Sequence, residues 1–373
     1  MDIYWNIEAI KVFAGYAFLM FIWPSVVFFD YLKKKSKIFW FSFCVTVQIV
    51  IVNTVILFMG LLHILNEQIV RCLFFGAFLF SVCRILINLK SSIWKKTKEI
   101  IANNSSSIVE YVLLLSVILF GMVYFSYGSF QIHTYGQYDT FLHHGWINKM
   151  AKGQIYPEGI YPVSMHCFIY CLYAMFRIRI YSIMLFLQCI HVTVFLLSAY
   201  CLMREIFKWR YSAVLVLTLY LTMDFTVSSM ARLQTTLPME FGLHTQFLCT
   251  LYLVRYLKYA ERNTKTNRFL NGELNENLLL FTMSLTASIV SHYYVTIMAF
   301  VFCLSFAVFD LKKILRHMIP LVVSVLCGCF IAAAPMIGAL ASEIPFEASI
   351  NWGLSVLYGN NEDSKGNDVN NYK

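Results

Sequence analysis

Apolar runs long enough to form membrane-spanning helices recur along the whole chain, and no other feature constrains its fold as strongly. An α-helix needs about 20 apolar residues to cross the hydrocarbon core of a bilayer. The chain is 59% hydrophobic and 13% charged, and its mean hydropathy is +0.66. Soluble domains carry about 25% charged residues. The runs are continuous and do not alternate between apolar and polar residues, which excludes a transmembrane β-barrel. The sequence therefore predicts an all-α, polytopic membrane protein.

The apolar runs predict about ten spans, with both chain ends on the extracytoplasmic side. A further apolar run, residues 162–176, is short for a span, and we expect it to form an interfacial helix at the outer leaflet. The predicted spans are residues 12–31, 38–62, 69–89, 108–127, 180–203, 213–227, 243–259, two spans within 278–309 divided at 291–294, and 319–340. The predicted regions are an N-terminal four-span region (1–127), a large extracytoplasmic loop with interfacial helices (128–179), a six-span core (180–340) and an extracytoplasmic tail (341–373).

Lysine and arginine gather in short segments between the predicted spans. All of these segments fall on one side of the membrane in the predicted topology, as the positive-inside rule requires of the cytoplasmic side. The formal net charge of +9 therefore reflects orientation, and we expect no nucleic-acid partner. The clusters are Lys33, Lys34, Lys35 and Lys37; Lys90, Lys95, Lys96 and Lys98; Arg204, Lys208 and Arg210; Arg255, Lys258, Arg262, Lys265 and Arg268; and Lys312, Lys313 and Arg316.

Some polar and sulfur-containing residues lie inside the predicted spans. The eleven cysteines occur almost wholly in apolar runs and lack the spacing of a disulfide framework or a zinc site, so we expect small, buried, apolar side chains. His191 lies in mid-span beside Gln188, where we expect it to form a hydrogen bond between helices.

The most polar segment between the spans is residues 133–166, HTYGQYDTFLHHGWINKMAKGQIYPEGIYPVSMH. It holds Asp139 and four of the nine histidines. Its middle predicts a short helix, with Asp139 as N-cap and Gly153 just beyond the C-terminal end. This helix is expected to lie on the membrane surface. Its apolar stripe would consist of Leu142, Trp146 and Met150.

Two roles for Asp139 are compatible with this pattern. A carboxylate at a helix N-terminus accepts hydrogen bonds from free backbone amides, and the helix dipole favours its charged form. The same charged form suits a general base, which would take a proton from an acceptor hydroxyl at the outer membrane surface. The sequence leaves both roles open for Asp139.

Histidines in this segment are candidates for binding a substrate or a metal. His143 lies one turn after Asp139 and could form a hydrogen bond with it, whereas His144 belongs to the polar face of the helix. Asp139 with His143 and His166 could hold a divalent metal ion, although the spacing matches no known metal motif. Solvated or hydrogen-bonded histidines explain the pattern more simply, so no metal or other cofactor is predicted.

Further candidates lie in other predicted extracytoplasmic segments. The guanidinium of Arg232 could hold the phosphate group of a lipid-linked donor with two parallel hydrogen bonds, and Lys149 or Lys152 could assist it. Each of these cations could equally anchor the chain to lipid headgroups. His292 and Tyr293 lie at the predicted turn between two spans, and ionisable residues at membrane depth are costly and often functional.

The pattern resembles the GT-C superfamily of integral membrane glycosyltransferases, especially its uncharacterised bacterial and archaeal members. The matching residues are Asp139, His143, Trp146, Gly153, Tyr161, Pro162 and His166, with His292 in a comparable outer turn. The resemblance covers roughly residues 120–340. It implies a polyprenyl-phosphate-linked sugar donor, inversion at the anomeric carbon, a catalytic role for Asp139, and a plasma membrane with the active site outside.

The leading hypothesis from the sequence is therefore a membrane glycosyltransferase, with Asp139 as base and with a glycan, lipid or protein as acceptor. Membrane lipids are its expected surroundings. A flippase or transporter of lipid-linked oligosaccharides is the first alternative, which requires polar groups at the bilayer midplane. A surface-polysaccharide polymerase or ligase is the second. The sugar, the acceptor, the lipid length and the oligomeric state are not specified by the sequence.

Overall fold

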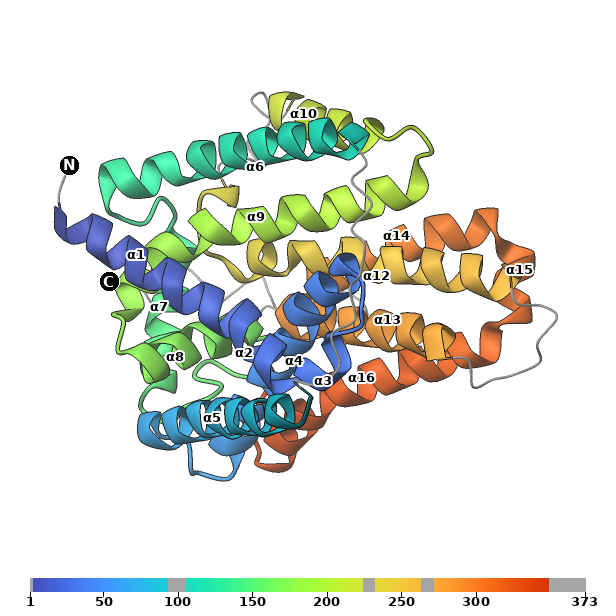
Figure 1. Ribbon diagram of the computed structural model, residues 1–373. Helices are drawn as coiled ribbons and strands as arrows, with labels where there is room; N and C mark the ends of the chain where they lie inside the picture. The colour runs from blue at the N-terminus through green and yellow to red at the C-terminus, as the bar shows by residue number, and fades with distance from the viewer. Residues whose placement is uncertain (1–2, 93–104, 224–231, 263–271, 349–373) are drawn as a thin grey trace, which may run out of the picture.

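The chain folds into a bundle of helices in the computed structural model, which describes residues 3–92, 105–223, 232–262 and 272–348 (Figure 1). Within these ranges the only β-structure consists of isolated bridges. The all-α prediction is thus confirmed for the described residues. The helices are α1 (Ile3–Ala17), a π-helical segment η1 (Phe18–Ile22), α2 (Trp23–Val27), α3 (Phe29–Leu32), α4 (Lys37–Leu61), α5 (Glu67–Ser92), α6 (Ser105–Ile132), α7 (Tyr138–Met150), α8 (Ser164–Phe176), α9 (Ile180–Ile206), α10 (Ser212–Met223), α12 (Pro238–Arg262), α13 (Gly272–Ser291), α14 (Tyr293–Phe309), α15 (Leu311–Arg316) and α16 (Met318–Ala341).

Six helices in the described ranges are long and apolar enough to cross a membrane. They support the prediction of a membrane protein, while the count of about ten spans stays a prediction. The predicted span 243–259 is helical but is not one of the six, because polar residues such as His244 and Arg255 lower its hydropathy. The six are Ile3–Val27, Lys37–Leu61, Glu67–Asn88, Ile108–Ile132, Ile180–Ile206 and Met318–Ala341, and shorter apolar helices are Ser164–Phe176, Ser212–Thr222, Glu276–Ser291 and Tyr293–Phe309.

The helix predicted to lie at the membrane interface, α8, is instead buried inside the bundle. It packs against α4, α5, α9, α12 and α13, and nearly all of its side chains are buried. Its end is fixed by Arg71 of α5, whose Nε and Nη2 donate hydrogen bonds of 3.0 and 2.7 Å to the carbonyl oxygen of Ala174. Residues 164–176 are apolar on every side, and such a helix is stable only where it is surrounded by other apolar surfaces.

Helix α7 also differs from the predicted surface helix. Its buried face is formed by Thr140, His143, Trp146, Ile147 and Met150. These side chains face α8 and α9, against which α7 packs. Leu142, which the sequence assigns to the membrane-facing stripe, is exposed. Two of the three residues of the predicted stripe, Trp146 and Met150, are thus buried against neighbouring helices, and only Leu142 lies on the exposed side of α7.

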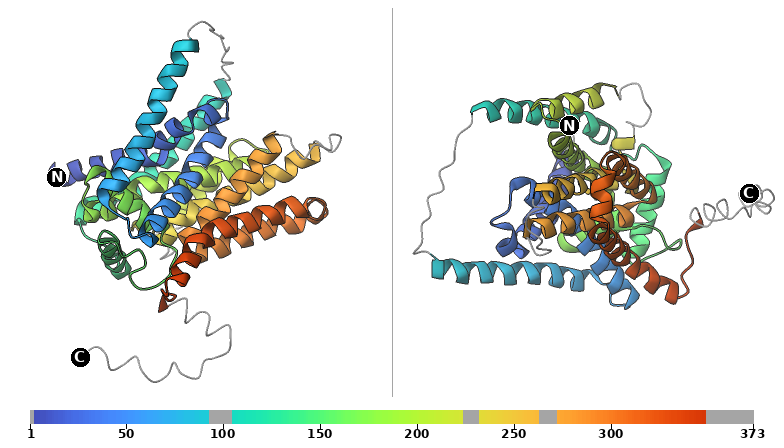
Figure 2. Two further views of the ribbon diagram at one scale, coloured as in Figure 1. Left: turned by 90° about the horizontal axis from the view of Figure 1, so that it is seen from below. Right: turned by 90° about the vertical axis from the view of Figure 1, so that its right-hand side faces the viewer.

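The α12–α13 pair organises the centre of the bundle (Figures 1 and 2). The hydroxyls of Thr245 and Ser288 lie 2.8 Å apart across this pair, and small side chains allow the close approach. The predicted break within 278–309 is confirmed, since α13 ends at Ser291 and α14 begins at Tyr293. His292 between them has an extended backbone, and its Nδ1 accepts a hydrogen bond from the amide of Tyr294 at 3.1 Å.

Hydrogen bonds inside the bundle confirm the interhelical role predicted for His191. Its Nδ1 lies 2.8 Å from the hydroxyl of Tyr16 in α1, and its Nε2 lies 2.8 Å from the carbonyl oxygen of Phe241 in α12. All eleven cysteines are free thiols. The closest pair, Cys249 and Cys303, has its sulfur atoms 3.7 Å apart.

Candidate functional site

Helix α7 presents Asp139 from its first turn. The N-cap is Gln137, so the prediction that Asp139 is the N-cap is wrong by two residues. The predicted C-terminal glycine is confirmed. Gly153 has a φ of +90°, its amide bonds to the carbonyl of Met150, and the amide of Gln154 reaches back to the carbonyl of Lys149. This pair of bonds is the Schellman motif. The glycine therefore ends α7 and turns the chain toward the next segment.

The carboxylate of Asp139 is exposed, and among the described residues it has no hydrogen-bond or ion-pair partner. Its charge nevertheless acts on a group of residues from other elements. Burial chiefly raises the pKa of Tyr161, and the carboxylates of Glu347, Glu240 and Asp139 raise it further. Three carboxylates from separate parts of the chain thus lie near enough to one tyrosine to act on its pKa.

An imidazole–aromatic cluster lies beside Asp139 and consists of His143, Trp146, Tyr161, His166 and His292. The Nδ1 of His143 lies 3.0 Å from the Nε2 of His166, so one ring donates a hydrogen bond to the other. The ring of Trp146 is 5.5 Å from that of His166, and the ring of Tyr161 is 5.9 Å from that of His292. Burial lowers the pKa of both His143 and His292 to about 4, which keeps both rings neutral at pH 7.

An ion pair between Arg232 and Glu240 also belongs to the site. The Nε of Arg232 donates a hydrogen bond of 2.8 Å to the Oε1 of Glu240. The Arg232 side chain is 42% exposed, whereas that of Glu240 is 1% exposed. Burial raises the pKa of Glu240, and the Arg232 guanidinium offsets only part of this effect. A buried carboxylate therefore holds a partly exposed guanidinium in place.

Several buried polar atoms in this region lack a hydrogen-bond partner. They come from α7, α8, α12 and the segment that joins α7 to α8. Buried polar atoms in native proteins nearly always have partners, so such a group indicates water or a ligand. The atoms are Thr140 Oγ1, Trp146 Nε1, Tyr156 OH, His166 Nδ1 and Glu240 Oε2.

The segment before α8 is held by residues that follow α16. The amide of Ile160 bonds to the carbonyl of Pro345 at 2.7 Å, and the amide of Glu347 bonds to the carbonyl of Ile160 at 3.2 Å. Gly159 has a φ of +114°, and a Cβ at this position would lie 2.7 Å from the amide nitrogen of Glu347. These bonds bring Glu347 to the site. The residues after 348 lie outside the described residues.

The structure brings together some of the predicted site residues and separates others. His143, His166, His292 and Arg232 gather around Tyr161, as does Tyr293, whose ring stacks on that of His292 with centroids 4.3 Å apart.

The remaining candidates on α7 point elsewhere. His144 contacts the rings of Tyr135 and Tyr181. Lys149 forms an ion pair with Glu158, and Lys152 is exposed beyond the end of α7.

The candidate site residues chosen from the sequence do not include Tyr161, Glu240 or Glu347, although Tyr161 is one of the residues that match the GT-C pattern. Glu240 had a local signal, since a carboxylate one turn before His244 at the end of an apolar helix is unusual. Glu347 had none, because only the tertiary fold brings residues 345–347 to the loop at Gly159.

No group of three or more His, Cys, Asp or Glu side chains in the described part of the chain is arranged to hold a metal ion. The metal site considered for Asp139, His143 and His166 is therefore not formed in this arrangement, in which the two imidazoles bond to each other.

Comparisons with known proteins add no relative: no protein-family model, no curated protein and no solved structure matches the chain.

Proposed function

We propose that the protein is a membrane glycosyltransferase of the GT-C type, which moves a sugar from a polyprenyl-phosphate donor to an acceptor hydroxyl at the extracytoplasmic surface. The observation that carries this proposal is the unpaired carboxylate of Asp139 near a guanidinium, Arg232, and a neutral imidazole–aromatic cluster. A base, an anion-binding group and aromatic surfaces are what a sugar phosphate requires.

The proposed reaction is a single displacement. The acceptor oxygen attacks the anomeric carbon, Asp139 takes the hydroxyl proton, and the bond between the anomeric carbon and the phosphate oxygen breaks. Polyprenyl phosphate leaves with the electron pair. Among the described residues, Glu240 is the partner of the Arg232 guanidinium, and it contacts only the Nε. The terminal nitrogens of the guanidinium can therefore bind the phosphate of the donor and the charge that develops there.

Neutral rings would shape the rest of the site. The exposed part of Tyr293, stacked on His292, offers a face for the sugar. The unpartnered buried atoms of the site, such as Trp146 Nε1 and Glu240 Oε2, would be satisfied by water or by hydroxyl groups of the ligand.

A transfer assay in membrane vesicles tests the proposal. Vesicles containing the protein receive a panel of radiolabelled polyprenyl-phosphate hexoses and pentoses, and label that appears in new glycan or glycolipid is measured. Loss of a general base typically costs about 10²–10⁴-fold in rate, so Asp139→Asn and Asp139→Ala should lose at least about 100-fold. The control is Asp310→Asn, which removes a carboxylate paired with Lys313 near α15. Wild-type turnover in Asp139→Asn would remove Asp139 from catalysis.

Transport of lipid-linked sugars is the second candidate, and buried amides inside the bundle favour it. Gln48 in α4 and Gln188 in α9 are almost fully buried, and their side-chain amide atoms have no partner in the described residues. Polar groups at membrane depth are typical of transport pathways. Sealed vesicles separate the two functions: a transporter moves the labelled donor across the bilayer without cleaving it, whereas a transferase consumes it. A polymerase or ligase would share the transfer chemistry and differ in the length of the product.

A further inference from the structure

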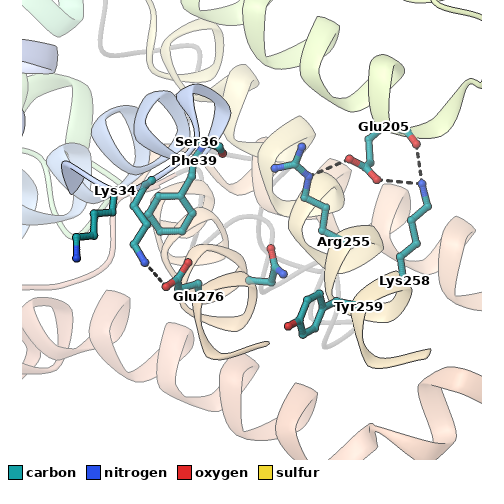
Figure 3. Close-up of a pocket in the computed structure, with 10 residues that line it drawn as sticks. Lys34, Ser36, Phe39, Glu205, Arg255, Lys258, Tyr259 and Glu276 are labelled. Carbon is teal, nitrogen blue, oxygen red and sulfur yellow. Dashed lines mark hydrogen bonds and ion pairs between the residues drawn. The ribbon is translucent and has the colours of Figure 1, made fainter. Parts of the chain in front are cut away.

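The α12–α13 pair has a second polar end, far from Asp139. Glu240 and Arg255 lie on the same helix, fifteen residues apart, which corresponds to about 22 Å along an α-helix. Near Arg255, the chain forms a pocket of about 410 Å³ between the end of α12, the start of α13, the end of α9 and the turn before α4 (Figure 3).

The pocket carries a net positive charge. Four cationic side chains and two carboxylates line it, which gives a net charge of +2. The cations come from two of the basic clusters that the sequence assigns to one side of the membrane, and Glu205 comes from the segment of a third. The cations are Lys34, Lys35, Arg255 and Lys258, and the carboxylates are Glu205 and Glu276.

Ion pairs fix the two walls of the pocket. Glu205 accepts hydrogen bonds from the Nε of Arg255 at 2.9 Å and from the Nζ of Lys258 at 3.0 Å. On the other wall, Lys35 pairs with Glu276 and lies over the ring of Phe39. These pairs join four separate elements, so the pocket is formed before any ligand arrives.

Two of the lining cations keep N–H groups that no carboxylate in the described residues engages, and the Arg255 guanidinium also lies over the ring of Tyr252. Arg255 contacts Glu205 through Nε, and Figure 3 shows its terminal nitrogens turned away from that carboxylate. Lys34 is exposed and has no partner in the described residues. Ser36, the N-cap of the 25-residue helix α4, also lines the pocket, and the N-terminus of a long helix favours an anion.

We propose that this pocket binds the phosphate group of an anionic ligand. A guanidinium, a lysine and a helix N-terminus around one cavity match phosphate, because each supplies positive charge or N–H donors to its oxygens. The phosphate comes either from the headgroup of an anionic phospholipid or from a soluble phosphoryl compound. The pocket lies at the ends of two apolar helices, α4 and α9, where lipid headgroups would meet it.

Binding to the full-length protein in neutral detergent tests the proposal, with one arm for each source. In the first arm, mixed micelles of phosphatidylglycerol and phosphatidylcholine are offered, and the retained lipid is quantified by native mass spectrometry. In the second arm, inorganic pyrophosphate is titrated by calorimetry. The wild type should retain phosphatidylglycerol preferentially or bind pyrophosphate, and added salt should weaken this binding.

Matched variants locate the binding. Arg255→Gln should weaken it about tenfold, because hydrogen bonds to charged groups are strong, and Lys34→Gln about threefold. Lys33→Gln is the control, since it removes the same charge one residue away, where Lys33 pairs with Asp30 outside the pocket. Arg255→Lys retains the charge and should bind more tightly than Arg255→Gln.

The two arms of the experiment distinguish a lipid-headgroup site from a site for a soluble ligand. A preference in the lipid arm identifies a headgroup site, and binding in the pyrophosphate arm alone identifies a soluble ligand. The proposal is overturned if the wild type shows neither, or if Lys33→Gln weakens binding as much as Lys34→Gln. If Arg255→Gln fails to fold, the exposed pair Lys34→Gln and Lys33→Gln still decides the question. Because the measurement is binding, its result is independent of the transfer assay.

Discussion

The two ends of the α12–α13 pair carry similar residues in opposite states. At the basic end, Glu205 and Glu276 are each paired with cations. At the other end, Asp139 has no partner in the described residues, and Glu240 uses one of its two oxygens. Paired carboxylates hold helices together by themselves, whereas a buried unpartnered oxygen such as Glu240 Oε2 is costly unless water or a ligand completes it. Under the proposed function, this difference is expected if the end with Asp139 binds the substrate.

The pH dependence of stability should reveal the difference between the two ends most strongly. The buried neutral histidines His143, His166 and His292 lie at the end with Asp139. An unfolded His143 takes up a proton below pH 6.5, whereas the folded side chain stays neutral until about pH 4. The stability that its burial provides is therefore complete above pH 6.5 and is lost as the pH falls to about 4. The full loss is about 3 kcal/mol from the 1.36 kcal/mol that each pKa unit represents.

The thermal midpoint in detergent, measured between pH 4 and pH 7.5, checks this prediction. His143→Asn should make the curve less steep in that interval, and His166 and His292, whose pKa values are also lowered by burial, should account for part of the remaining slope. His63→Asn, in an exposed turn, is the control for loss of a histidine outside the site. A His143→Asn variant as acid-sensitive as the wild type would contradict the prediction.

The loop that carries Tyr161 provides the next largest effect. Gly159→Ala forces an L-residue to a φ of +114° and brings its Cβ to 2.7 Å from the amide of Glu347. The backbone strain alone costs about 1–3 kcal/mol, and the contact with residues 346–347 adds to it. We expect a lower thermal midpoint and, because Glu347 moves away from Tyr161, slower transfer.

Gly145→Ala is the matched change, since a Cβ at Gly145 meets nothing within 4 Å. Gly145 lies in the middle of α7, where alanine is favoured over glycine by about 0.5–1 kcal/mol. The thermal midpoint should therefore rise slightly or stay constant. Equal losses in both variants would show that the pairing of Ile160 with Pro345 and Glu347 does not hold this loop.

The elements of the site were easier to predict than their arrangement. Apolar runs and the glycine that ends α7 are local features, so the helices and Gly153 followed from the sequence. The break at His292 followed from the length of the apolar run 278–309. Local features also explain why a helix beginning near Asp139 could be predicted, although its N-cap is Gln137 and not Asp139.

Contacts between distant segments could not be derived in the same way. The burial of α8 depends on the helices around it, and its short length suggested an interfacial helix instead. The pairing of Arg232 with Glu240 depends on how the chain enters α12, and the position of Glu347 depends on the end of α16. Such relations arise from packing, which a residue pattern with periods of 3.6 residues does not encode.

The smallest expected effect compares one carboxylate from each end. Glu276→Gln removes the charge that pairs with Lys35, but both side chains are about a fifth exposed, so the thermal stability should fall by less than about 1 kcal/mol.

Glu240→Gln should behave differently. Because the folded pKa of Glu240 is raised, its charged form is disfavoured in the folded protein, and the wild type loses stability relative to the glutamine variant as the pH rises through that pKa. At neutral pH the variant should thus be at least as stable as the wild type, while Arg232 loses its charged partner and transfer slows. Paired measurements of thermal midpoint and turnover check this. If Glu276→Gln lost turnover as strongly as Glu240→Gln, the two ends would not differ in function as proposed.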